Sequence, residues 1–222
     1  AIMLIVANWK MNLLKKDIKE LIDSWQKNKD DIKKLYISYD DYNNNLEVVI
    51  CPSFPYLDFV KETLRPLPFK IGAQNAFGKD EGAYTGEVSP LMIKDLGCSY
   101  IILGHSDRRK HNVETDYNIF NKVKISLKNG LKVIWCCGES LLQREYGLTN
   151  KIIETQLDYL RPLFLPTSEF NIQDIQDNLI IAYEPIWAIG TSNIATPDII
   201  NNVHTKIKET LCSYNNIGYK NI

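Results

Sequence analysis

The chain has 222 residues, of which 26 are Lys or Arg and 27 are Asp or Glu, and 45% are hydrophobic. This composition is typical of globular proteins and excludes a low-complexity or grossly disordered chain. A net charge of −1 provides no general attraction to nucleic acid or to an anionic membrane, so we expect neither as a partner. We see no linker that would divide residues 1–222, and one α/β domain is the simplest interpretation.

Short apolar runs alternate with longer amphipathic runs along the chain. The predicted strands are Ile2–Asn8, Glu47–Cys51, Lys70–Gln74, Tyr100–Gly104, Lys132–Cys137 and Leu179–Glu184. The predicted helices between and after them are Asp17–Lys27, Tyr56–Leu64, Pro90–Leu96, Thr115–Lys128, Asn150–Leu160 and Pro197–Tyr214. Several strands are nearly continuous Ile, Val and Leu, which is typical of parallel strands buried on both faces. The alternation predicts a parallel sheet, either doubly wound or closed into a barrel.

Two polar stretches interrupt this alternation. Lys33–Asn45 and Arg161–Asn178 are rich in Asn, Asp or Gln, and we expect both to be surface excursions. No stretch approaches the ~20 apolar residues of a membrane span. The apolar opening lacks a basic segment before it, so it is predicted to be a first strand rather than a signal peptide.

The cysteines indicate a reducing compartment. They are five in number and scattered, with no CxxC pair and no histidine at zinc spacing: Cys51, Cys98, Cys136, Cys137 and Cys212. We therefore expect no metal site and an intracellular protein. The adjacent Cys136 and Cys137 are predicted to be buried thiols rather than a redox pair.

Polar residues with chemical potential follow the predicted strands, at the edge where α/β enzymes build their sites. Asn8 and Lys10 follow the first strand, His105 the fourth, and Glu184 ends the sixth. Each has a plainer interpretation. Lys10 could be a solvent lysine and His105 a structural histidine. Glu184, which is costly to bury without a partner, could pair with one of the arginines that follow His105.

The motifs that contain these residues, taken in order, resemble those of the triosephosphate isomerase family over essentially the whole chain. They are Asn8-Trp9-Lys10, Gly72-Ala73-Gln74-Asn75, Gly82–Ser89, Gly104-His105-Ser106 with Asp107-Arg108-Arg109, Cys136–Ser140 and Tyr183–Thr191. The resemblance implies a (β/α)8 barrel, of which this chain carries the first six βα units. Another phosphosugar barrel would require a Schiff-base lysine inside a strand or a metal cluster.

The resemblance also implies an activity. The family interconverts D-glyceraldehyde 3-phosphate and dihydroxyacetone phosphate, a step of glycolysis and gluconeogenesis, by proton transfer through an enediolate. Glu184 would be the base and His105 a neutral donor that polarises the carbonyl. Lys10 and Asn8 would face the developing negative charge. This chemistry requires no metal and no organic cofactor.

Further roles come from the same resemblance. The family's closing lid would be Pro185, Ile186, Trp187, Ala188, Ile189, Gly190 and Thr191. Trp187 would anchor it, and the backbone N–H of Gly190 would bind the substrate phosphate. Thr85 and Gln74 would contact the second subunit of a homodimer. The implied location is the cytoplasm, with an organelle stroma as the alternative.

Three features depart from the family pattern. Asp107 stands where the family usually has glutamate. Its side chain is one methylene shorter, so we expect a slightly looser network of charged residues supporting the site. Thr191-Ser192-Asn193 replaces a hinge with glycine in the middle, and serine tolerates positive φ less well. The sequence ends at Asn221-Ile222, before the seventh strand and the phosphate-binding loops. We expect a longer gene product; the alternatives are a natural six-unit protein or one that is completed by another chain. The alternative to the isomerase function is a catalytically impaired barrel that serves as a binding or assembly module.

Overall fold

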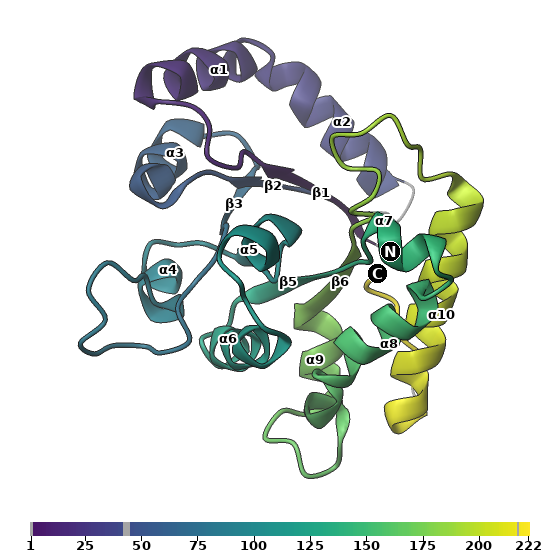
Figure 1. Ribbon diagram of the computed structural model, residues 1–222. Helices are drawn as coiled ribbons and strands as arrows, with labels where there is room; N and C mark the ends of the chain where they lie inside the picture. Colours follow the sequence, from purple (N-terminus) through teal and green to yellow (C-terminus); the bar gives the residue numbers. More distant parts are fainter. Residues whose placement is uncertain (1, 42–44, 217) are drawn as a thin grey trace.

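The computed structural model describes residues 2–41, 45–216 and 218–222. Its centre is one curved sheet of six strands, all parallel and neighbours in chain order, as the sequence predicted (Figure 1). The strands are β1 (Ile2–Asn8), β2 (Asn45–Cys51), β3 (Lys70–Ala73), β4 (Tyr100–Leu103), β5 (Lys132–Cys137) and β6 (Leu179–Tyr183). Each agrees with its predicted run to within two residues.

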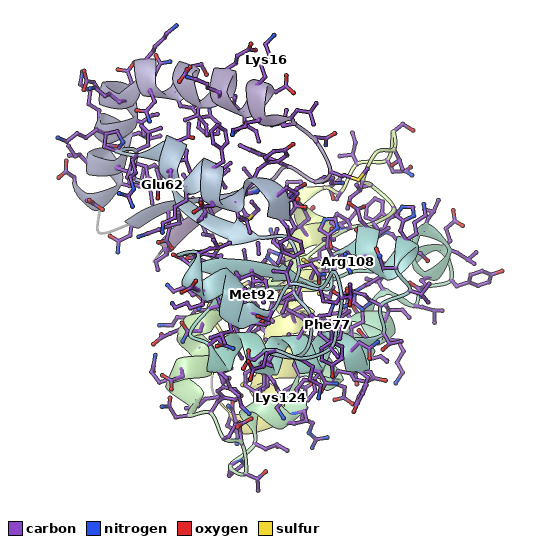
Figure 2. The ribbon with its side chains drawn as sticks, turned by 90° about the vertical axis from the view of Figure 1, so that its left-hand side faces the viewer. Lys16, Glu62, Phe77, Met92, Arg108 and Lys124 are labelled. Carbon is purple, nitrogen blue, oxygen red and sulfur yellow. The ribbon has the colours of Figure 1, made fainter. Side chains whose placement is uncertain are left out.

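Helices surround the convex side of this sheet (Figure 1). Those that the sequence predicted are α1 (Lys15–Lys27), α3 (Leu57–Leu64), α4 (Pro90–Asp95), α6 (Asp116–Lys128), α8 (Thr149–Asp158) and α10 (Pro197–Asn215). The helices that it missed are α2 (Lys29–Asp41), α5 (Ser106–His111), α7 (Leu141–Glu145) and α9 (Ile172–Asn178), with short 3-10 turns at Phe54–Tyr56 and Arg161–Phe164. Figure 2 shows Lys16 projecting from the outer face of α1 into solvent.

Local signals set several helix boundaries. The hydroxyl of Thr196 accepts a hydrogen bond from the backbone N–H of Ile199, and Pro197 occupies the first turn of α10. At the end of α6, Gly130 has a φ of 76°, a conformation that glycine adopts without strain. Both boundaries follow from the sequence pattern.

The core has two layers because side chains alternate across each strand. The larger cluster lies between the sheet and the helices and includes Ile101, Leu103 and Trp135. The smaller cluster lies on the concave face, where Ile102 and Ile134 pack together with Val49, Cys51, Tyr100 and Cys136. Because the alternation continues to the end of each strand, every second side chain there also points to the concave face.

The sheet is open between its first and last strands. Among the described residues, β1 has only β2 as a strand neighbour and β6 only β5. The C-terminal segment starts to follow β6, because the backbone N–H of Ile181 donates to the carbonyl of Asn221 at 2.8 Å. A cavity of about 560 Å³ runs along the concave face and is lined by residues from both ends of the chain.

The two polar stretches are more ordered than the sequence suggested. Most of the first forms α2, which has no buried residue among those described and is a surface element as expected; residues 42–44 lie outside the described residues. The second is a correction. Leu163, Phe164 and Ile175 from this stretch are buried in the main core, because apolar positions recur among its polar residues. In the described parts of the chain, no helix is long and apolar enough to span a membrane.

Candidate active site

The site lies at the carboxyl ends of the strands, where three predicted residues line one cavity. These are Asn8 at the end of β1, His105 after β4 and Glu184 after β6. Their convergence follows from strand parity. Ile180 and Ala182 border the concave cluster, so Glu184, two residues further on, continues on the concave face.

His105 and Glu184 are in direct contact. The Nε2 of His105 lies 3.0 Å from the Oε2 of Glu184, and their side chains are only 14% and 13% exposed. Ser106 donates twice to the same carboxylate, from its backbone N–H to Oε1 and from its hydroxyl to Oε2, each at 3.0 Å. The carboxylate therefore has three polar contacts in a largely buried site.

These donors determine the charge of Glu184. Burial alone would raise its pKa, but the hydrogen bonds and charge of His105 and the two hydrogen bonds from Ser106 outweigh burial and lower the pKa below its ordinary value of 4.5. Glu184 is thus a carboxylate at neutral pH, which is the protonation state that a general base needs.

The tautomer of His105 follows from its other nitrogen. The backbone N–H of Asp107 donates to Nδ1 of His105 at 3.0 Å, at the start of α5. Because Nδ1 accepts this hydrogen bond, the neutral ring carries its proton on Nε2, the nitrogen that faces Glu184 and the cavity. In its neutral form, His105 can therefore donate a hydrogen bond from Nε2 toward the cavity.

Lys10 supplies the cation near this pair. Its Nζ lies 3.4 Å from the Oδ2 of Asp107, and both side chains are close to half exposed, so the ion pair is weak. Its backbone N–H donates to Oδ1 of Asn8 at 2.9 Å. Lys10 has a φ of 54°, a conformation that costs a non-glycine residue about 1–2 kcal/mol.

The arginines next to His105 do not pair with Glu184, which removes the plainer interpretation of that carboxylate. Arg109 donates to the carbonyls of Gly104 and Cys136 and pairs with Asp116. Arg108 pairs with Glu114 at 2.9 Å. Arg109 thus holds the backbone directly before His105, and Arg108 ties α5 to Glu114.

Glycine allows the backbones to approach at the site. A Cβ on Gly138 would lie 1.9 Å from the carbonyl oxygen of Glu184, a distance that no side chain can accept. The backbone N–H of Glu184 also donates to the carbonyl of Cys137 at 2.7 Å. The chain after β5 thus fixes the position of Glu184.

Trp187 anchors the segment that was predicted to be a lid, Pro185–Thr191. This side chain is only 6% exposed, and its Nε1 donates to Oε1 of Glu139 at 2.8 Å. Tyr183 donates to the same oxygen at 2.6 Å, and the guanidinium of Arg144 lies 4.5 Å above the Trp187 ring. Near the other end of the segment, Gly190 is exposed. It has a φ of 66°, and a Cβ added there would meet no other atom within 4 Å.

The altered hinge carries no backbone strain at Ser192. Among the described residues, Ser192 is not one of those with a positive φ. Instead, Asn193 closes the hinge with its side-chain amide on the carbonyl of Trp187 at 3.2 Å and its backbone N–H on the hydroxyl of Thr191 at 3.1 Å. The penalty expected for serine is therefore avoided.

The two predicted subunit contacts occupy different settings. Thr85 lies in an exposed loop, in which Tyr84 packs on Phe77 with ring centroids 4.6 Å apart. Gln74 is partly buried and uses its side-chain amide within the chain, on the carbonyls of Lys10 and Cys51. Their contact with a second subunit remains a prediction.

All five cysteines are free thiols, and Cys136 and Cys137 are buried as expected. Burial, the largest influence, raises the pKa of both thiols well above the ordinary value, so they are protonated. In the described part of the chain, no cluster of three His, Cys, Asp or Glu side chains could hold a metal ion.

Three residues of the site had no role in the sequence interpretation. Ser106 and Glu139 lie inside the recognised motifs, but nothing in the pattern shows what they contact. Glu139 is fully buried, and its only sequence signal is a charge directly after a buried strand. Arg144 lies on a helix that the sequence did not predict.

Comparison with known proteins agrees with this geometry. The family model described as triosephosphate isomerase matches residues 3–221. The chain is 42% identical over 206 residues to the triosephosphate isomerase of Neurospora crassa. The aligned region covers 92% of this chain and 74% of that protein. It is 42% identical to the triosephosphate isomerase of Carboxydothermus hydrogenoformans, over 93% of this chain and 75% of that protein. It is 36% identical to that of Aquifex aeolicus, over 96% of this chain and 78% of that protein. The chain belongs to the triosephosphate isomerase family.

Proposed function

We propose that the protein interconverts D-glyceraldehyde 3-phosphate and dihydroxyacetone phosphate, the reaction of glycolysis and gluconeogenesis that its relatives' name denotes. The observation that carries this proposal is the contact between the Glu184 carboxylate and the Nε2 of His105 in one cavity. Moving a proton between adjacent carbons requires a base at carbon and a donor at the carbonyl oxygen. These two side chains provide both.

Glu184 removes the proton from the carbon next to the carbonyl. In the ligand-free protein its pKa is lowered by His105 and Ser106, which makes it a weak base. A substrate that displaces the Ser106 hydrogen bonds strengthens this base, because burial then raises its pKa. The proton returns from Glu184 to the neighbouring carbon, and the carboxylate is regenerated.

The remaining groups act on the oxygens. As negative charge develops on the carbonyl oxygen, the Nε2–H of His105 donates to it, and the ammonium of Lys10 stabilises the same charge. His105 gives its Nε2 proton to that oxygen and takes up the proton of the neighbouring hydroxyl, so that the old carbonyl becomes a hydroxyl, the old hydroxyl becomes a carbonyl and the ring is restored. The lid, Pro185–Thr191, excludes water from the enediolate, and the exposed N–H of Gly190 binds the phosphate as the lid closes. None of these steps requires a metal or an organic cofactor.

We also propose a homodimer in which Thr85 and Gln74 meet the second subunit, and a cytoplasmic location, with an organelle stroma as the alternative. The exposed loop around Thr85 supports the first proposal. Five free cysteines, four of them buried, support a reducing compartment.

The decisive experiment compares the wild-type protein with Glu184→Gln and with Glu20→Gln, a surface control whose partner is Lys16. Turnover of glyceraldehyde 3-phosphate to dihydroxyacetone phosphate is followed together with thermal unfolding. We expect Glu184→Gln to lower kcat by about 10³-fold or more without unfolding the protein. Near-full kcat in this variant would contradict the assignment of the base.

The same preparations separate an enzyme from an impaired binding module. An isomerase binds 2-phosphoglycolate, which carries both a phosphate and an enediolate-like carboxylate, far more tightly than inorganic phosphate. A module without catalytic function would bind the two ligands equally and would show no turnover.

A further inference from the structure

The carbonyl of Lys10 accepts two side-chain hydrogen bonds from two other strand ends. Gln74, directly after β3, donates from Nε2 at 2.9 Å, and Ser53, two residues after β2, donates from its hydroxyl at 3.1 Å. Neither residue lines the cavity that holds His105 and Glu184. Both donors therefore act on the backbone of Lys10 and not on the reacting atoms.

Both hydrogens of the Gln74 amide nitrogen are used in this arrangement. Its nitrogen has two hydrogens, and the second binds the carbonyl of Cys51 at 2.8 Å. The same carbonyl accepts the backbone N–H of Trp9 at 3.1 Å. Gln74 thus joins the ends of β1 and β2 from its place at the end of β3.

The backbone held in this way is in an unusual conformation. Lys10 has a φ of 54° although it carries a side chain, and Leu13, three residues further on, has a φ of 73°. Non-glycine residues remain in this region only when their surroundings hold them there. Below Lys10, its own N–H is held by Oδ1 of Asn8 at 2.9 Å. Both peptide groups flanking Lys10 are therefore held by side chains.

This backbone conformation decides where the ammonium goes. The direction of the Cα–Cβ bond depends on φ, and with φ at 54° the side chain reaches across the strand ends to within 3.4 Å of Asp107, whose backbone N–H binds His105. Rotation of φ to the ordinary negative range would turn the side chain away from that point. The loop would then relax, and the cation would leave the site.

We propose that Ser53 and Gln74 are positioning residues of the isomerase, which hold the carbonyl of Lys10 and thereby fix its left-handed backbone and the place of its ammonium. The proposal rests on the proposed function for its catalytic consequence, but the clamp itself can be tested without turnover. Ser53 and Gln74 act from different elements, so each can be removed separately.

The clamp is tested by proteolysis of the native full chain. Trypsin cleaves after lysine, and the bond that it cuts after Lys10 contains the clamped carbonyl. In Ser53→Ala and Gln74→Met we expect cleavage after Lys10 to accelerate about fivefold or more, the ratio that corresponds to one neutral hydrogen bond. Ser53→Thr, which keeps the hydroxyl, should restore the wild-type rate.

Gln26 provides a matched control for the loss of a glutamine amide. Its Nε2 donates to the carbonyls of Thr63, Leu64 and Arg65, on the outside of the barrel. Gln26→Met should leave cleavage after Lys10 unchanged. Unchanged cleavage after Lys10 in both Ser53→Ala and Gln74→Met would overturn the proposal, whatever the activity of the protein.

Steady-state kinetics then separate positioning from a general loss of structure. A misplaced ammonium weakens binding of the anionic substrate, so KM should rise about fivefold in Ser53→Ala and more in Gln74→Met. A merely structural defect lowers the fraction of folded enzyme, which reduces kcat and leaves KM unchanged. The latter pattern would contradict the proposal, whereas a wild-type protein without any turnover would instead contradict the proposed function.

Discussion

Trp187 donates the hydrogen of its indole nitrogen to the buried carboxylate of Glu139, 2.8 Å away. Glu139 is fully buried, and its other oxygen has no hydrogen-bond partner within the described residues, with Arg144 at 4.0 Å. The proposed lid segment is therefore attached to the segment after β5 through a buried carboxylate, which relies on Trp187 and Tyr183 as hydrogen-bond donors.

The first prediction concerns this attachment. Trp187→Phe removes one donor from a buried carboxylate, and we expect the free energy of unfolding to fall by about 1–3 kcal/mol. Trp25→Phe is the control. Trp25 packs against the rings of Trp9 and Phe69, and its replacement removes the same side-chain volume. Chemical denaturation measures both; an equal effect of the two substitutions would show that the indole hydrogen bond contributes nothing.

A second prediction follows from the lowered pKa of Glu184. Ser106→Ala removes the hydroxyl donor, so the pKa of Glu184 should rise and the acid limb of the kcat/KM profile should move to higher pH. Ser106→Thr keeps the hydroxyl and serves as the control. Comparing the three proteins on one substrate cancels the titration of the substrate phosphate. A profile that does not move in Ser106→Ala would mean that this hydrogen bond does not set the acidity of the base.

The elements that carry this site were predictable because strands and helices are indicated by short local patterns of apolar and polar residues. Runs of Ile, Val and Leu located six strands, and the polar residues that follow them, Asn8, His105 and Glu184, were therefore expected at one edge of the sheet. The contacts of Glu139 and Arg144 were not predictable, since they join residues distant in sequence. Helix α2 was missed because it buries no face, so its sequence lacks the apolar stripe that indicates a helix. The burial of Phe164 was missed because polar residues surround it in the sequence.

The third prediction concerns the buried ion cluster behind His105. Burial alone would raise the pKa of Glu114, but hydrogen bonds and charges from Lys122 and Arg108 outweigh it and lower the pKa below 4.5. The resulting stabilisation is complete above about pH 4.5 and is lost as the pH falls through the folded-state pKa. Glu114→Gln should therefore lower stability by about 1–3 kcal/mol at pH 7 and by less at pH 3.

Unfolding free energies at the two pH values test this prediction. Glu62→Gln is a suitable control, because its partner Arg65 lies in an exposed pair at 3.6 Å. The interpretation would be wrong if Glu114→Gln lowered stability equally at both pH values.

A fourth prediction uses the close approach between Gly138, directly after β5, and Glu184, the proposed base. Gly138→Ala would place a Cβ 1.9 Å from the carbonyl oxygen of Glu184, so that backbone must shift. Because a displacement of about 1 Å can cost about 10²-fold in rate, we expect kcat to fall by that order. Gly218→Ala, where a Cβ meets open space, should leave kcat unchanged. Equal kcat in the two variants, with both folded, would show that the position of Glu184 tolerates this shift.

The central claim is that Glu184 moves a proton between carbons, and hydrogen exchange with solvent measures that step directly. Dihydroxyacetone phosphate is incubated in D₂O with the wild-type protein and with Glu184→Gln, and the carbon next to the carbonyl is followed by NMR. We expect deuterium at that carbon with the wild type and only the background rate with the variant. Equal deuterium incorporation by both proteins, or undiminished isomerisation by Glu184→Gln, would contradict the role of Glu184 as the base.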